Sequence, residues 1–146
     1  MHAVIFDIDH TIFDANQGLR DGVAELLAIL QNLGLRVGAI SNKDHRAYVH
    51  LDEAGIRHYF ADVMCSAHSD QPKSAESLHR LLQQLGAELH QTALVSHAHA
   101  DILLGKDAGI GRTIGISHGI DNIGPLREAG ADHIVSNIPA VLDVLD

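Results

Sequence analysis

Short apolar runs alternate with amphipathic helical segments from one end of the chain to the other, and this alternation limits the fold more than any other feature. Residues 3–6 form a fully apolar run, typical of a strand that is buried on both faces of a sheet. Residues 18–33 then carry apolar side chains at helical spacing, and Gly34 follows as a stop signal. Repeated strand–helix units of this kind predict an α/β fold, in which helices cover both faces of a parallel sheet.

The same pattern continues along the rest of the chain. We expect further strands at residues 36–40, 60–64, 92–95, 112–116 and 133–135, and further helices at 44–54, 74–85, 101–108 and 126–129 and from Pro139. A chain of 146 residues fits one hydrophobic core, so we expect residues 1–146 to form a single domain. Ligands of such sheets bind beyond the carboxyl ends of the strands, which makes the residues directly after each strand the candidates for function.

Composition argues against several classes of protein. The formal net charge is -9 and there are only 10 Lys and Arg residues, which argues against a surface for nucleic acid or anionic membranes. The single cysteine, Cys65, excludes an internal disulfide framework, and its place after a predicted strand favours a buried apolar role over a nucleophile. The N-terminal apolar run is too short for a signal peptide or a membrane span, so a cytoplasmic protein is expected.

Two carboxylates follow the first predicted strand. Because side chains alternate along an extended chain, Asp7 and Asp9 lie on the same side, with Ile8 pointing away. Carboxylates this close repel each other at the end of a buried strand unless a cation compensates them. The pair therefore indicates a site, although a turn or helix-cap role for Asp9 or Thr11 is an equally good explanation of these residues alone.

Polar residues also follow the other strands. Ser41 and Asn42 have side chains suited to hydrogen-bonding phosphate oxygens, and a helix-cap role is compatible with that. Lys73 opens a predicted helix, where a cation is poorly placed for the helix dipole, so a charge directed at the carboxylates is an alternative to a surface lysine. Asp101 follows the fourth strand, where metal binding and helix capping compete.

In this order, the motifs resemble those of the haloacid dehalogenase superfamily. FDIDHT (6–11) matches its DxDxT motif, AISN (39–42) its second-strand Ser or Thr, PKSAESLHRLLQQLG (72–86) its lysine-bearing helix, and LVSHAHADILLGKDAGI (94–110) its acidic fourth motif. The resemblance covers essentially the whole chain. It implies a three-layer, doubly wound, Rossmann-like sheet with strand order 5-4-1-2-3.

The resemblance also implies roles for the site residues. Asp7 would attack phosphorus and form an aspartyl-phosphate, and Asp9 would protonate the leaving group and then activate water. Thr11 and Ser41 would bind the phosphoryl group, as the side chain of Asn42 also suits, and Lys73 would offset its charge. Mg²⁺ is the expected cofactor, held by Asp7, the backbone of Asp9, and fourth-motif carboxylates that include Asp101.

The fourth motif departs from the family pattern. Ser96 and His97 stand where phosphatases of the family usually carry Gly-Asp, so Mg²⁺ binding should be weaker, and an imidazole ligand would favour Mn, Co, Fe or Zn. His10, His97, His99 and His118 all follow predicted strands. We expect solvated or hydrogen-bonded histidines; the alternative is a transition-metal site that some of them form with Asp7 and Asp101.

The intervals 11–41 and 42–73 are too short for a cap domain, so the resemblance is to a cap-less member with an open site. A large substrate or a second subunit of a homo-oligomer would suit such a site, and residues 14–18 form either a specificity loop or a plain polar turn. The expected function is a phosphomonoester hydrolase that acts on a small phosphorylated substrate or a phosphorylated macromolecule. The alternative is a catalytically impaired relative that binds a phosphorylated ligand or partner; metal-free carbon–halogen hydrolysis is disfavoured by Asp9.

Overall fold

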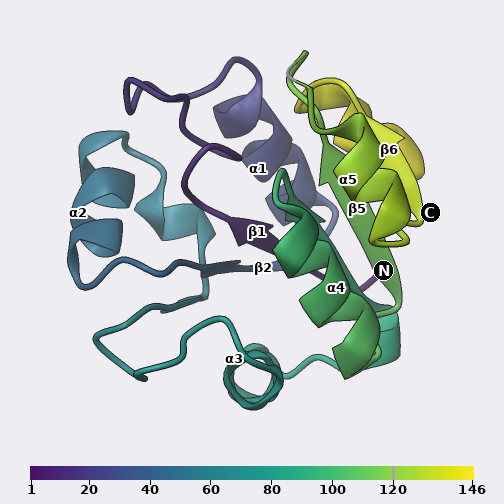
Figure 1. Cartoon of the computed structure of the whole chain (residues 1–146). Coiled ribbons are helices and arrows are strands. Elements are labelled where there is room, and N and C mark those ends of the chain that lie inside the picture. Colours follow the sequence, from purple (N-terminus) through teal and green to yellow (C-terminus); the bar gives the residue numbers. More distant parts are fainter. Residues whose placement is uncertain (120) are drawn as a thin grey trace.

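A computed structural model describes residues 1–119 and 121–146 and contains a six-stranded parallel sheet with the order β3-β2-β1-β4-β5-β6 (Figure 1). The strands are β1 (Ala3–Asp7), β2 (Arg36–Ile40), β3 (Asp62–Met64), β4 (Thr92–Ser96), β5 (Arg112–Ile116) and β6 (His133–Val135). The predicted order 5-4-1-2-3 is confirmed, and β6 extends the sheet beyond β5.

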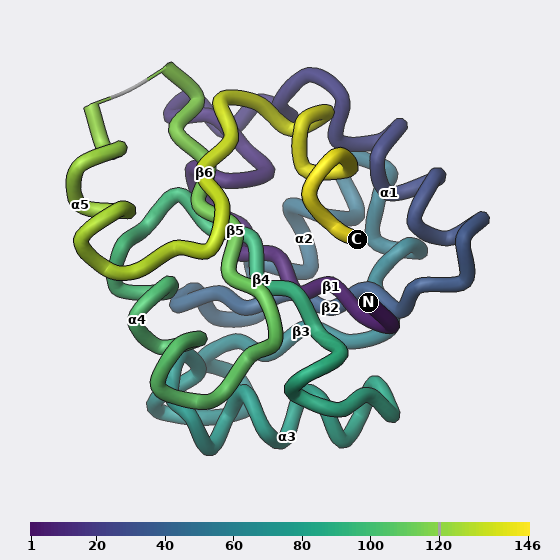
Figure 2. Tube along the Cα trace, turned by 90° about the vertical axis from the view of Figure 1, so that its right-hand side faces the viewer, coloured from purple at the N-terminus to yellow at the C-terminus, as the bar shows by residue number. Residues whose placement is uncertain are grey.

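Helices cover both faces of this sheet. They are α1 (Val23–Asn32), α2 (Arg46–Glu53), α3 (Ala75–Leu85), α4 (His99–Ala108) and α5 (Ile123–Glu128), with short 3₁₀-helices η1 (Arg57–Tyr59), η2 (Leu89–Gln91) and η3 (Pro139–Val144). α1 and α2 pack in one apolar cluster on one face, and the leucines of α3 form a second cluster on the other. Figures 1 and 2 show α1 and α3 on opposite sides of the central strands. No helix of the described residues is long and apolar enough to cross a bilayer.

Local sequence signals explain α3 well. Leu78, Leu81, Leu82 and Leu85 are its buried stripe, as their spacing predicts. The Ser74 hydroxyl accepts a hydrogen bond from the Ser77 backbone N–H, so Ser74 caps the first turn, and Lys73 lies in the loop before the helix rather than opening it.

Some predicted boundaries were wrong. β3 begins at Asp62 rather than at residue 60, because only three of its residues pair with β2, while Phe60 contributes to the core from outside the strand. The segment after Pro139 is a 3₁₀-helix, and α4 begins two residues earlier than expected, at His99. Cys65 follows β3 and is fully buried, in agreement with an apolar role.

The parallel arrangement brings the functional candidates to one edge. β1 lies between β2 and β4, and in register Asp7 is opposite Ile40, one residue before Ser41. Ser96, at the end of β4, lies one position beyond Val95, the partner of Phe6. The carboxyl ends of the central strands therefore hold the polar residues from all three segments.

Candidate active site

Asp7 is the centre of a buried polar cluster at this edge. Its side chain is only 2% exposed, and it contacts Thr11, Lys73 and His97 directly. Asp7 ends β1, Thr11 lies in the turn after it, Lys73 precedes α3, and His97 directly follows β4. Only the tertiary fold brings them together, because Lys73 and His97 are 66 and 90 residues away from Asp7 in the chain.

Lys73 bridges two carboxylates. Its Nζ lies 2.7 Å from Asp7 Oδ1 and 3.0 Å from Asp101 Oδ2, and the side chain is 16% exposed. Burial would lower the pKa of Lys73, but the charges of Asp7 and Asp101 outweigh burial and raise it. Lys73 is therefore a charged ammonium at neutral pH.

The other oxygen of Asp7 has separate donors. Thr11 Oγ1 donates to Asp7 Oδ2 at 2.9 Å, and His97 Nδ1 lies 3.1 Å from the same oxygen. His97 Nδ1 also lies 3.0 Å from Thr11 Oγ1. Since an ionised carboxylate can only accept, His97 hydrogen-bonds Asp7 in the form that carries a proton on Nδ1. The His97 backbone N–H also donates to Thr11 Oγ1, at 3.0 Å. Burial raises the pKa of Asp7, but the hydrogen bond from His97 and the charge of Lys73 outweigh it, so the pKa is lowered.

Asp101 is the second buried carboxylate. Its Oδ2 accepts from Lys73 and from Ser96 Oγ, the latter at 2.8 Å, and the Ala98 backbone N–H donates to Ser96 Oγ at 3.0 Å. Burial and the charge of Asp7 raise the pKa of Asp101 in spite of Lys73. The two carboxylates therefore differ: Asp7 is held as the anion, and Asp101 ionises less readily.

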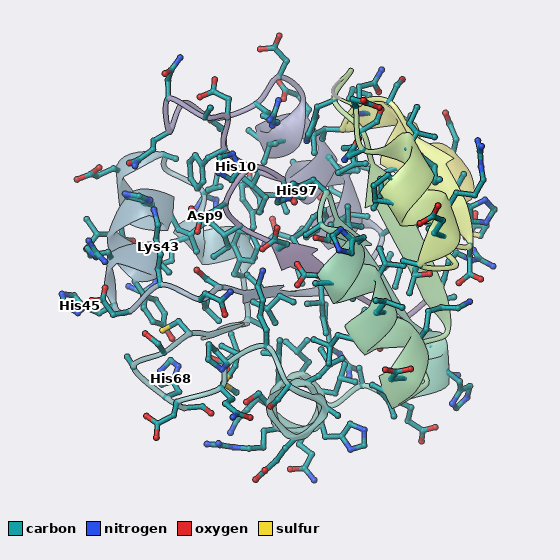
Figure 3. The ribbon with its side chains drawn as sticks, viewed as in Figure 1. Asp9, His10, Lys43, His45, His68 and His97 are labelled. Atoms are coloured by element: carbon teal, nitrogen blue, oxygen red, sulfur yellow. The ribbon has the colours of Figure 1, made fainter. Side chains whose placement is uncertain are left out.

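Asp9 lies outside this cluster, on the solvent side. Its side chain is 33% exposed and its Oδ1 is 3.2 Å from Lys43 Nζ (Figure 3). A cavity of about 220 Å³ lies beside the pair and is also lined by His10, Asp14 and Gln17, among others. Lys43 was not among the predicted site residues. The signal that could have indicated it is its position shortly after β2, a strand predicted to lie next to β1.

The two predicted phosphate-binding residues after β2 do not contact Asp7. Ser41 is buried, and its Oγ accepts the Lys43 backbone N–H at 3.0 Å, which makes a local turn. Asn42 is exposed. The loop after β1 is likewise a compact turn, in which Asp14 Oδ1 accepts from the backbone N–H groups of Asn16 and Gly18.

The four strand-end histidines do not form a metal cluster. His99 is exposed, and the rings of His10 and His97 are 5.4 Å apart between centroids. His118 Nε2 lies 3.0 Å from the Thr11 carbonyl oxygen, and burial with the nearby charge of Arg20 lowers the pKa of His118 to about 4. Across residues 1–119 and 121–146, no three His, Cys, Asp or Glu side chains are placed to hold a metal ion. The described residues therefore show no ligand cluster for the transition-metal alternative.

The arrangement does not fit Mg²⁺ either. Mg²⁺ needs a near-octahedral set of oxygen ligands. Both oxygens of Asp7 already accept hydrogen bonds from protein groups, and the Lys73 ammonium lies between Asp7 and Asp101. His97 directs Nδ1 at Asp7, at 3.1 Å. Of the expected ligands, the side chains of Asp7, His97 and Asp101 are thus engaged with one another or with Lys73, which leaves the backbone carbonyl of Asp9.

Comparison with known proteins identifies the family. A family model described as haloacid dehalogenase-like hydrolase matches residues 11–109, which include Thr11, Lys73, His97 and Asp101. The chain belongs to this family. Among solved members, a haloacid dehalogenase-like hydrolase from Streptococcus pneumoniae has a TM-score of 0.85 with 17% identity, over 100% of this chain and 99% of that chain. At that identity the likeness shows the shared fold.

Curated relatives in the family are phosphatases of longer chain. The N-acetylmuramic acid 6-phosphate phosphatase of Pseudomonas aeruginosa is 31% identical over 132 residues, which cover 86% of this chain and 57% of the relative. The pyrophosphatase PpaX of Halalkalibacterium halodurans is 25% identical over 127 residues, which cover 86% of this chain and 59% of the relative. This chain therefore spans little more than half the length of these relatives.

Proposed function

We propose that this protein is a phosphomonoester hydrolase that works through an aspartyl-phosphate on Asp7. One observation carries the proposal: a buried carboxylate, held as the anion by Lys73 and His97, stands two residues before a second carboxylate that faces solvent. Two carboxylates in such different surroundings suit the roles of nucleophile and proton carrier. The phosphatases among the relatives support the same chemistry.

Asp7 Oδ1 is the oxygen best placed to attack. It contacts only Lys73 among the contacts of Asp7 described above, whereas Oδ2 contacts both Thr11 and His97. In the first half-reaction, Oδ1 forms a bond to phosphorus, the bond from phosphorus to the leaving oxygen breaks, and Asp9 gives that oxygen a proton. Lys73 Nζ, beside Oδ1, stabilises the charge on the phosphoryl oxygens.

In the second half-reaction, water attacks the phosphorus of the aspartyl-phosphate. Asp9 takes the proton from that water, the bond from phosphorus to Oδ1 breaks, and inorganic phosphate leaves with Asp7 restored. Lys43, 3.2 Å from Asp9 Oδ1, holds the Asp9 side chain in place for both proton transfers. No step is assigned to Mg²⁺, because the donor set does not fit it.

The site is proposed to be open, within one core domain of residues 1–146. Only α1 stands between β1 and β2, and α2 with η1 between β2 and β3, so the described chain places no cap domain over Asp7 in these intervals. Small phosphorylated molecules, as named for the relatives, fit this site, and so does a phosphate group displayed on a larger molecule.

The test is direct detection of the aspartyl-phosphate. A ³²P-labelled aryl phosphate, mixed with the protein and quenched in acid, should label a peptide that contains Asp7, and hydroxylamine should remove the label. Asp7→Asn should abolish both label and turnover, while Asp107→Asn, which changes an exposed aspartate of α4, should retain both. Turnover that survives Asp7→Asn would refute the proposed nucleophile.

A binding role is the second candidate, and His97 is the observation that favours it. The family pattern has a carboxylate at this position. Here an imidazole stands in its place and contacts Oδ2 of the proposed nucleophile, Asp7. If the wild-type protein binds inorganic phosphate at this site but neither labels nor turns over any aryl phosphate, the binding role replaces the hydrolase.

A further inference from the structure

The acceptor capacity of Asp7 sets a limit on what this site can bind. A carboxylate oxygen has two lone pairs in its plane, and Oδ2 faces three protein groups: Thr11 Oγ1 at 2.9 Å, His97 Nδ1 at 3.1 Å and Ser96 Oγ at 3.4 Å. Oδ1 accepts from Lys73 at 2.7 Å and keeps one lone pair, which the attack on phosphorus requires. A divalent cation could bind Asp7 only by displacing a donor or by occupying the nucleophilic lone pair.

His97 is held in place on both sides by its backbone. Its N–H donates to Thr11 Oγ1 at 3.0 Å, and its carbonyl oxygen accepts from Asn122 Nδ2 at 3.0 Å. The same Asn122 amide nitrogen donates to the Ile116 carbonyl oxygen at 3.1 Å, at the end of β5. The segment that carries the imidazole is thereby tied to the turn after β1 and, through Asn122, to the end of β5.

Asp101 is engaged through one of its two oxygens. Its Oδ2 accepts from Lys73 at 3.0 Å and from Ser96 Oγ at 2.8 Å, and the residue is 4% exposed. The two buried carboxylates therefore have internal partners, an ammonium that they share and hydroxyl and imidazole donors. Buried charges that are paired and hydrogen-bonded in this way have little to gain from an added ion.

We propose that His97 takes the place of the divalent cation on Asp7, so that this site binds no Mg²⁺ and works with protein donors alone. The contacts of Asp7, His97 and Asp101 support the exclusion of the metal. Turnover without a metal rests in addition on the proposed hydrolase function. His97 is then a positioning residue, which orients the nucleophile and leaves Oδ1 free to attack.

Direct metal binding tests the exclusion without any assay of activity. Metal-stripped wild-type protein is titrated with Mg²⁺ by calorimetry and with Mn²⁺ by electron paramagnetic resonance, beside His97→Asp and the matched control His99→Asp. His99 is exposed and two residues away, so its variant adds the same charge outside the cluster. We expect no saturable site in wild type or His99→Asp. For His97→Asp we expect one saturable site, at least about 10-fold tighter than the weakest binding that the titration would detect in wild type.

Each outcome bears on the inference. A saturable site in wild type that Asp7→Asn removes would overturn it, and so would a His97→Asp protein that is folded by circular dichroism yet binds no better than wild type. Turnover of an aryl phosphate that is undiminished in EDTA supports the catalytic part, and turnover lost in EDTA and restored by Mg²⁺ overturns it. If wild type is inert and also binds no metal, the hydrolase proposal fails while the exclusion of the metal is supported.

Discussion

Lys43 Nζ lies 3.2 Å from Asp9 Oδ1, and this ion pair joins the loop after β2 to the loop after β1 at the carboxyl edge of the sheet. Both side chains are partly exposed, at 26% and 33%, so the pair contributes at most about 1 kcal/mol to stability. Its importance is therefore positional, because it fixes the carboxylate proposed to carry the proton.

Replacing Lys43 by Met should slow turnover with little effect on folding. We expect kcat to fall by about 10- to 100-fold, because a proton carrier that is no longer held in place loses its alignment. Steady-state kinetics on an aryl phosphate and a thermal melt measure the two effects. Arg46→Met, which breaks the exposed pair with Asp44, is the control and should leave kcat unchanged. Equal kcat for Lys43→Met and wild type would show that the pair does not position Asp9.

Replacing Lys73 by Met should destabilise the protein strongly. The change leaves Asp7 and Asp101 buried without the ammonium between them, which costs about 3–5 kcal/mol. Urea unfolding at pH 7 measures this, and adding Asp101→Asn to the variant should recover part of the loss. Lys106→Met removes an exposed pair and should cost at most about 1 kcal/mol. If the two single variants were equally stable, the Lys73 bridge would not be the stabilising feature described.

His118 should make stability depend on pH between about 6.5 and 4. Burial and then the charge of Arg20 lower the pKa of His118 from 6.5 to about 4 in the folded protein. Above pH 6.5 the imidazole is neutral in both states. As pH falls from there to about 4, the unfolded chain takes up a proton that the folded protein does not, so the free energy of unfolding decreases.

The change attributable to His118 should be about 1–2 kcal/mol, after allowance for the partial exposure of the ring. Urea unfolding of wild type and His118→Asn at pH 7 and pH 4.5 measures it; Asn is chosen because it tolerates the φ of 52° at this position. The variant should lose less stability between the two values than wild type. Parallel losses would mean that the imidazole is protonated in the folded state.

A methyl group at Gly111 should be poorly tolerated. A Cβ there would lie 2.1 Å from the His90 carbonyl oxygen, a backbone atom that cannot turn away. We expect Gly111→Ala to lower the free energy of unfolding by about 1–3 kcal/mol or more. The control is Gly124→Ala in α5, where the described residues leave open space around the added Cβ, and which should be neutral or stabilising by up to about 1 kcal/mol. If Gly111→Ala were as stable as wild type, the backbone of η2 would not pack against Gly111 as closely as described.

The sheet was predictable because its signals are local. An apolar run such as residues 3–6 can be buried only inside a covered sheet, and the leucine spacing of α3 places one face against the core whatever its neighbours are. The ends of strands were less predictable where an apolar residue packs in the core without pairing in the sheet. Phe60 is apolar and packed in the core, yet the ladder of β3 begins only at Asp62.

The sequence predicted which residues belong to the candidate site better than it predicted what those residues contact. Asp7, Thr11 and Asp101 were named because they follow strands that end at one edge, and Lys73 because a cation is poorly placed at the start of a helix. These four residues do lie together. Asn42 was named on the strand-end argument and is exposed, and Lys43, its neighbour, was missed. The direction of a loop side chain depends on the packing of the loop, which strand order does not determine.

The sequence by itself determined the α/β architecture, the strand order through family resemblance, and the edge at which the polar residues gather, since these follow from hydrophobic period and ordered motifs. Only the tertiary structure decided what each polar atom meets. Whether His97 would be a metal ligand, a solvated side chain or a donor to Asp7 depended on a contact across 90 residues of chain, at 3.1 Å. Hydrogen bonds form over a few tenths of an ångström, and sequence spacing does not fix distances between separate strands that closely.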